Sequence, residues 1–171
     1  MNREELSALL DSMREALEAL TSGRPVDKAE GEADSFMAGV YRLGLELHGN
    51  AALRASPEYR KFLEDSSRVL PYAMIYLEYF VDRLLTRLYH GSILNWKAIC
   101  EKRSGVEFFF ELYRDTPFAG FLENFELGEL DPALRRQAVF EGYVPPEEIP
   151  PSIPESHWWW RPTQEDLAPA Q

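Results

Sequence analysis

The stretch from Ser66 to His90 constrains the fold more than any other part of the chain, because apolar residues lie on nearly all sides of the helix it predicts. The narrow polar strip that remains consists of Glu78, Asp82, Arg83, Thr86 and Arg87. Pro71 fits the first turn of a helix, where its missing N–H costs nothing. The pattern therefore predicts a central helix that other helices must cover.

Two helices are expected before this one. The segment 2–20 has a capping box, in which Asn2 is followed by Glu5, and a single apolar stripe. A second helix is expected from about Asp27 to His48, and its residues Gly39 and Gly44 indicate either a close helix crossing or a break.

Other helix starts are marked by capping residues. Ser92 and Ser104 are each expected to cap a helix, Ser104 as part of a capping box. A capping residue followed by proline predicts starts at Ser56–Pro57, Thr116–Pro117 and Asp131–Pro132. No alternating apolar and polar run is bounded by hairpin turns, so no sheet is expected. The sequence predicts an all-α fold, a single irregular helical bundle of about seven or eight helices.

The composition changes at Val144. Residues 144–171 hold seven of the twelve prolines and three of the four tryptophans. Repeated proline prevents a long helix and favours an extended, polyproline-like backbone. We therefore expect a helical domain over residues 1–143 and an extended proline-rich C-terminal tail over residues 144–171, packed on that domain.

The net charge of −11 argues against a nucleic acid or an anionic membrane as the partner, since both attract positive charge. Residues 104–171 carry 13 acidic side chains against four arginines, so the negative charge is concentrated there. This distribution favours a basic protein as the partner.

A reducing compartment fits the single cysteine, Cys100, which cannot form an internal disulfide. The N-terminus lacks a basic run followed by an apolar one, so no signal peptide is expected. No apolar run approaches the roughly 18 residues of a membrane helix. We expect a cytoplasmic protein that is a monomer or a homodimer.

The sequence contains no visible apparatus for catalysis. It has no Glu-x-x-His pair of the di-iron bundles, no glycine-rich phosphate loop, no Ser–His–Asp order and no zinc-ligand spacing. His90 suits a helix end, and Cys100 has no histidine placed beside it by the sequence. We therefore expect no enzyme, no catalytic residue, no cofactor and no metal ligand.

An excess of aromatic residues over what one buried stripe needs lies beside acidic residues in the segment 107–131. Such a mixture is typical of a face that binds a basic protein, although a plain solvated acidic surface has the same composition. The predicted partner-binding residues of this segment are Glu107, Glu111, Glu123, Glu126, Glu129 and Asp131.

The run Trp158, Trp159 and Trp160, followed by Arg161, is also a candidate for partner binding. Each indole can bury about 150–250 Å² of surface, so the three rings must find a pocket. In one interpretation the tail wraps over the domain and the rings fill its core, with Arg161 held by a carboxylate. In the other, at least one ring binds the partner.

These observations favour a protein–protein interaction module, a small acidic inhibitor of the immunity or antitoxin type that binds and blocks a basic protein. The alternative is a small helical enzyme or ligand-binding bundle with a tyrosine-lined pocket closed by the C-terminal tail. A buried cavity beside Glu78, Asp82 or His90 would favour the alternative.

Overall fold

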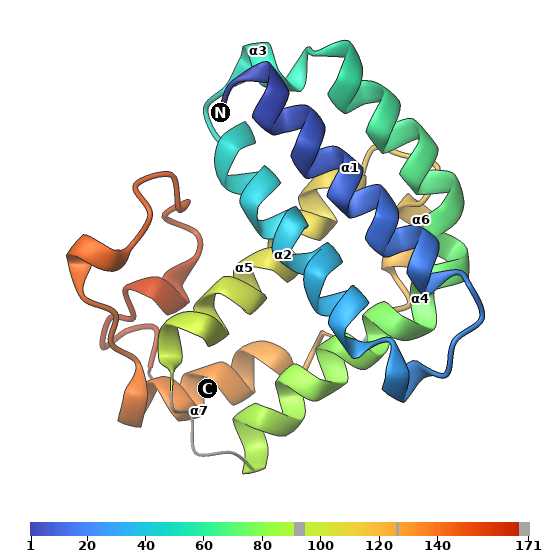
Figure 1. Cartoon of the computed structure of the whole chain (residues 1–171). Helices are drawn as coiled ribbons and strands as arrows, with labels where there is room; N and C mark the ends of the chain where they lie inside the picture. Colours follow the sequence, from blue (N-terminus) through green and yellow to red (C-terminus); the bar gives the residue numbers. More distant parts are fainter. Residues whose placement is uncertain (91–94, 126, 168–171) are drawn as a thin grey trace.

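The protein is all-α in the computed structural model, which describes residues 1–90, 95–125 and 127–167 (Figure 1). The α-helices are α1 (Arg3–Leu20), α2 (Glu30–Leu47), α3 (Ala51–Arg54), α4 (Pro57–His90), α5 (Trp96–Tyr113), α6 (Ala119–Leu122) and α7 (Leu130–Glu141). Three 3₁₀ turns, η1 (Val26–Lys28), η2 (Pro146–Glu148) and η3 (Trp158–Trp160), complete the elements in these ranges. The described residues contain no β-strand, so the predicted fold class is confirmed.

The central helix is longer than its pattern predicts. α4 begins at Pro57, directly after the predicted cap Ser56, and runs for 34 residues with Pro71 inside it. The prediction that Pro71 starts a helix is therefore wrong. An interior proline costs about 3 kcal/mol, and burial of the helix on both sides of Pro71 offsets this cost. We expected other helices to cover the apolar residues of α4, but not every one is covered, since Tyr72 is 77% exposed.

The two helices predicted to start at Ser92 and at Ser104 are a single helix, α5, in the part of the chain that is described. α5 runs through Ser104 without a break, so the predicted capping box at Ser104 is wrong. The cap of α5 is Asn95, whose side chain accepts a hydrogen bond from the N–H of Ala98 at 3.1 Å. The other predicted cap, Ser92, lies outside the described residues.

The glycines of α2 mark close helix crossings. A Cβ atom on Gly39 would lie 2.5 Å from Met13 of α1, and one on Gly44 would lie 2.2 Å from the ring of Phe108 on α5. Contacts this short are impossible for a real Cβ, so α2 approaches α1 and α5 only because these residues are glycine. The crossing, and not the break, is the correct alternative.

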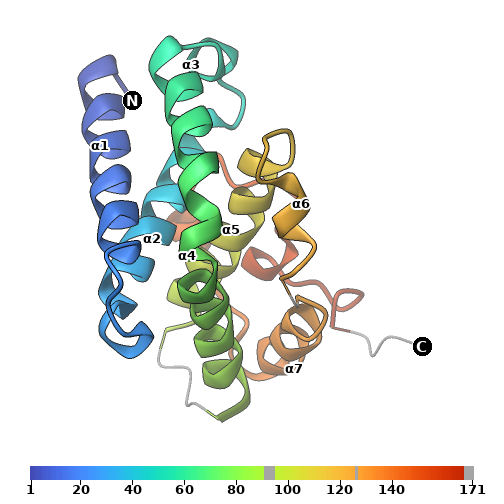
Figure 2. The ribbon, with the colours of Figure 1, turned by 90° about the vertical axis from the view of Figure 1, so that its right-hand side faces the viewer.

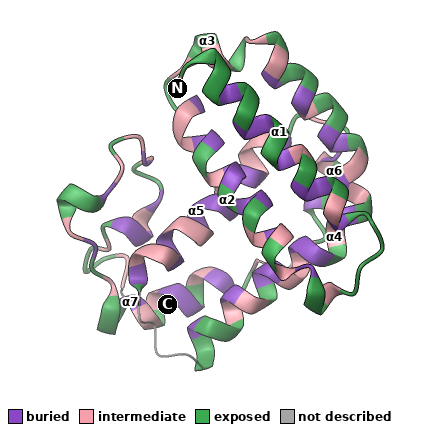
Figure 3. Cartoon of the chain, in the orientation of Figure 1, coloured by how far each residue is buried: buried purple, intermediate pink, exposed green. Residues whose placement is uncertain are grey.

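The helices enclose two groups of buried side chains. The first lies where α1, α2, α4 and the second half of α5 meet, toward the α3 end of the molecule (Figures 2 and 3). The second lies toward the α7 end, between the last turns of α4, the first half of α5, α7 and the tail. Both groups use α5, which therefore joins the two halves of the bundle.

The tail covers the second group of buried residues. Val144, Ile149, Ile153, Trp159 and Trp160 are all buried against α5 and α7. The backbone differs from the expected continuous extended segment, because it turns at η2 and again at η3. These turns allow the apolar residues of the tail to face the helices while its prolines occupy the bends.

Candidate functional site

The predicted acidic residues do not form a single free surface. Glu123 and Glu129 are exposed, and Glu129 accepts a hydrogen bond from the hydroxyl of Tyr89 at 2.9 Å. Glu111 is half-buried near the end of α5, far from Glu129 at the start of α7. Glu126 lies outside the described residues.

Glu107 and Asp131 instead bind an arginine inside the molecule. Arg103 is only 6% exposed, and it donates to Glu107 at 2.8 Å and to Asp131 at 3.0 Å. Its guanidinium also lies 4.3 Å from the centre of the Trp159 ring. Asp131 therefore ties α7 to α5, and the prediction that Asp131 caps a helix is wrong, since α7 begins at Leu130 and has no side-chain cap.

Two of the three predicted tryptophans are inside the protein. Trp159 is 2% exposed and Trp160 is 1% exposed, whereas Trp158 is half-buried beneath the guanidinium of Arg135. The backbone carbonyl of Trp159 accepts hydrogen bonds from the indole N–H of Trp96 at 3.1 Å and from the thiol of Cys100 at 3.2 Å. The interpretation in which the tail fills the core agrees with this burial.

Ser104 fastens the tail to α5. Its hydroxyl oxygen accepts the indole N–H of Trp159 at 3.0 Å and that of Trp160 at 2.8 Å. Both acceptor positions of the oxygen are then used, so the hydroxyl hydrogen must be the one donated to Nδ1 of His157, 3.0 Å away. His157 consequently carries its proton on Nε2, which is buried and has no partner in the described structure.

The environment of His157 keeps its ring neutral. Burial is the main cause that lowers its pKa to about 4, and the positive charge of Arg103 lowers it further. The ring stacks on Trp159 at 4.7 Å between centres. A neutral, stacked and hydrogen-bonded histidine that is 1% exposed is a structural residue, because no substrate can reach it.

Arg161, the last predicted partner-binding residue, is exposed. We expected a carboxylate of the acidic region to hold it, but Arg161 forms no ion pair with any residue that the structure describes.

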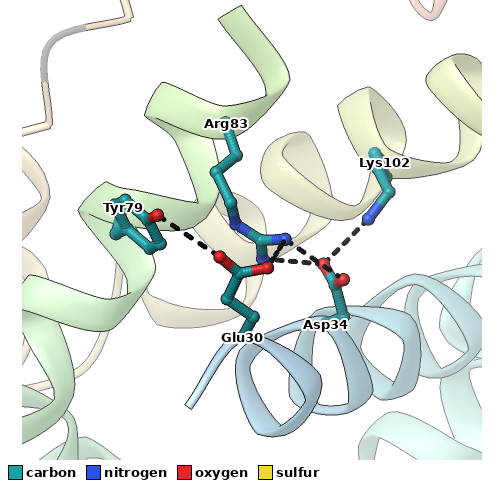
Figure 4. A network of polar contacts seen from close by, with 5 residues as sticks. All are labelled: Glu30, Asp34, Tyr79, Arg83 and Lys102. Atoms are coloured by element: carbon teal, nitrogen blue, oxygen red, sulfur yellow. Dashed lines mark hydrogen bonds and ion pairs between the residues drawn. The ribbon is translucent and has the colours of Figure 1, made fainter. Parts of the chain in front are cut away.

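Another polar network joins α2, α4 and α5 (Figure 4). Arg83, from the polar strip of α4, donates to Glu30 at 3.2 Å and to Asp34 at 3.1 Å. Lys102 donates to the same carboxylate of Asp34 at 2.8 Å. Burial alone would raise the pKa of Asp34, but Lys102 and Arg83 outweigh it and hold that pKa below its usual value. The network is a clamp between three helices, and Arg83 of the narrow polar strip is part of it.

Two hollows bear on the alternative of a tyrosine-lined pocket. One of about 220 Å³ lies beside the clamp and contains Tyr41, and one of about 480 Å³ contains Tyr59. Each has one tyrosine, and no tail residue lines either. A third hollow, of about 200 Å³, lies beside Glu78 and Asp82, but Asp82 is exposed, so this is a surface depression and not a buried cavity.

A surface that the sequence patterns did not identify lies at the end of α7. Val139, Phe140 and Tyr143, here called the α7 face, are 56%, 83% and 72% exposed. A signal for it was present in the sequence, because Val139 and Phe140 fall on the opposite side of the helix from the buried residues Leu134 and Ala138.

No described helix has the length and apolar character needed to cross a membrane. Within the described ranges, no group of three or more histidine, cysteine, aspartate or glutamate side chains is arranged to hold a metal ion. Comparison of the chain with known protein families, with curated proteins and with solved structures found no match.

Proposed function

We propose that the chain is a protein-binding module, that its partner is a basic protein and that the α7 face is the centre of the contact. The exposure of Val139, Phe140 and Tyr143 carries this proposal. Burying an apolar side chain of this size contributes about 1.5–3 kcal/mol, so a partner that covers the three gains free energy that folding leaves unused. Aromatic residues at the centre of an interface commonly supply most of its binding energy.

The charges around the α7 face support a basic partner. Glu141 lies in the last turn of α7 and Glu147 follows in η2, and both carboxylates are exposed. Glu129 is exposed just before the other end of the helix. Between these two ends α7 also carries a positive charge, Arg136, whose guanidinium lies over the ring of Tyr89. An apolar centre with carboxylates at both ends is complementary to an apolar patch bordered by lysine or arginine.

A second copy of the same chain is a poorer occupant of the α7 face. A two-fold contact through this face would bring Glu141 of one copy toward the carboxylates of the other, and this repulsion opposes association. The net charge of −11 acts in the same direction.

The finer form of the proposal is a cytoplasmic inhibitor of the immunity or antitoxin type. Such a protein must bind its target rapidly and cover the active or binding site of the target. The concentration of 13 acidic side chains against four arginines in residues 104–171 supports this role, because opposite charges accelerate encounter with a basic protein.

The test is retention of a partner from native extract by the immobilised protein and by two variants. Phe140→Ser should lose the partner, whereas Tyr72→Ser should keep it. Tyr72 is a matched control, because it is 77% exposed and Phe140 is 83% exposed. It lies on α4 about 18 Å along the helix axis from Leu84, the first α4 residue of the core cluster that includes α7. Both variants should keep the melting temperature of the unaltered protein, since neither side chain is buried.

The charge part of the proposal is tested on the same retained protein. Reversing Glu141 and Glu147 to lysine should slow its association, and added salt should slow association of the unaltered protein, because exposed charges are screened beyond about 8 Å at physiological ionic strength. A retained protein that is acidic, or that binds Phe140→Ser and the unaltered protein equally, would refute the proposal.

A further inference from the structure

The helices α2, α3, α4 and α5 come together at the end of the bundle opposite α7 (Figures 1 and 2). Residues of these four helices line a hollow of about 480 Å³. Its volume falls in the range of about 300–1,000 Å³ that is usual for small-molecule sites. Its apolar floor is lined by Gly44, Leu47, Tyr59 and Phe108.

The apolar part of this wall is well ordered by packing. Leu47 is 2% exposed and Phe108 is 1% exposed, and the Phe108 ring is held against the bare backbone of Gly44. Tyr59 is 8% exposed, and burial raises the pKa of its phenol while nearby Arg54 acts in the opposite direction. The hollow therefore combines a fixed apolar floor with a phenol beside a guanidinium.

Four charged side chains surround this floor, two of each sign: Arg54, Arg114, Glu111 and Asp115. None of the four forms an ion pair with a described residue, although eleven ion pairs occur elsewhere among the described residues. Arg54 is positioned by its Nε, which donates to the backbone carbonyl of Leu47 at 3.0 Å. Its two terminal nitrogens remain available to a ligand.

We propose that this hollow binds a small zwitterion, an apolar amino acid or dipeptide with free amino and carboxylate groups. Guanidinium groups bind carboxylates with paired, charge-assisted hydrogen bonds, so Arg54 and Arg114 receive the carboxylate. Glu111 and Asp115 receive the ammonium group, and the apolar side chains lie on the floor beside Phe108. A simple anion would face two carboxylates here, and a simple cation would face two guanidinium groups. A ligand of both charges is complementary to all four side chains, of which Arg54, Arg114 and Asp115 are exposed and Glu111 is half-buried.

The test is calorimetric titration of the intact protein with the dipeptide Leu-Leu, with its N-acetyl derivative and with its C-terminal amide. Leu-Leu should bind, and blocking either end should weaken binding by about tenfold or more, because each block removes a charge-assisted contact. Arg54→Gln and Glu111→Gln should each weaken Leu-Leu binding by a similar factor.

Matched controls separate this site from a general charge effect. Arg60→Gln and Glu123→Gln change exposed charges outside the hollow and should bind Leu-Leu as the unaltered protein does. Phe140→Ser should also bind normally, because the α7 face lies at the other end of the molecule, so this result is independent of the protein partner. Absence of binding at millimolar Leu-Leu, equal binding of the N-acetyl derivative, or equal losses in the control variants would each overturn the proposal.

Discussion

At the scale of single residues, Ser104 shows how much one hydroxyl can determine. It is fully buried and forms three hydrogen bonds to the tail, so it is the polar centre of an otherwise apolar contact. Burying a polar group is costly unless its hydrogen bonds are made. The tail must therefore return to one register on α5, because a shift would leave two indole N–H groups and a hydroxyl without partners.

The neutral state of His157 predicts a pH dependence of stability. Its pKa in the folded protein is about 4, below the ordinary value of 6.5, so the unfolded chain binds a proton at a higher pH than the folded chain does. The free energy of unfolding is therefore highest above pH 6.5 and falls as the pH drops toward 4, by about 3 kcal/mol from this group. Urea unfolding at several pH values measures this loss.

The control for that experiment is His157→Asn, whose side-chain carbonyl can still accept the hydroxyl of Ser104. This variant should lose the part of the pH dependence that lies between pH 6.5 and 4.5. Asp34 and Glu58 also have lowered pKa values, and their stabilising contributions are lost as the pH falls below their ordinary values of 3.8 and 4.5, so the range above pH 4.5 isolates His157 from them. Equal slopes in the variant and the unaltered protein would show that His157 does not titrate as inferred.

The same residues show why the sequence did not predict the site completely. Ser104 followed by Glu107 satisfies the local rule for a helix start, but nothing local reveals that the hydroxyl belongs to Trp159, Trp160 and His157, more than 50 positions away. Glu107 is equally misleading, because its partner Arg103 becomes buried only through tertiary packing.

At the scale of elements, the patterns predicted helices well and their boundaries less well. The start of α4 at Ser56–Pro57 and the crossings of α2 follow from capping chemistry and from the lack of a side chain on glycine. The sequence patterns do not predict that the helix continues through Pro71. Helix propensity gives the cost of an interior proline, but it does not give the burial energy that offsets this cost. The exposure of Phe140 was predictable only from its position on the side of α7 opposite the buried residues.

The close crossing of α2 and α5 predicts opposite effects of two identical substitutions. Gly44→Ala places a methyl group 2.2 Å from the Phe108 ring, so it should lower the free energy of unfolding by about 1–3 kcal/mol through overpacking. Gly31→Ala, in the same helix with nothing within 4 Å, should raise it by up to about 1 kcal/mol through helix propensity. Chemical unfolding of both variants checks the difference, and stabilisation by both would contradict the crossing.

At the scale of the whole molecule, the chain has two different ends joined by α5. The α7 end carries exposed apolar residues with carboxylates beside them. The α3 end carries a hollow whose charged side chains, of both signs, form no ion pair with a described residue. Composition predicted a negatively charged binding protein but could not place its surfaces, because the acidic residues are divided between internal pairs and solvent. Only packing decides which of them remain free.

The tail gives the last prediction, since its role is decided by what it covers. Truncation after Val144 removes four buried apolar residues, Ile149, Ile153, Trp159 and Trp160, and exposes the α5 and α7 side chains beneath them. Each contributes about 1.5–3 kcal/mol on burial, against a total stability of about 5–15 kcal/mol for a typical domain. The truncated protein should therefore aggregate or melt at a much lower temperature, as differential scanning calorimetry would measure.

Truncation after Arg161 is the matched control. It keeps the four buried side chains and the hydrogen bonds to Ser104, so its melting temperature should stay close to that of the full chain. The opposite interpretation makes the tail a recognition arm, and it requires the Val144 truncation to keep its stability and lose its partner. If that result were found, the contact between Ser104 and the two tryptophans would be too weak to hold the tail. The run Trp158–Trp160 would then replace the α7 face as the candidate for partner binding.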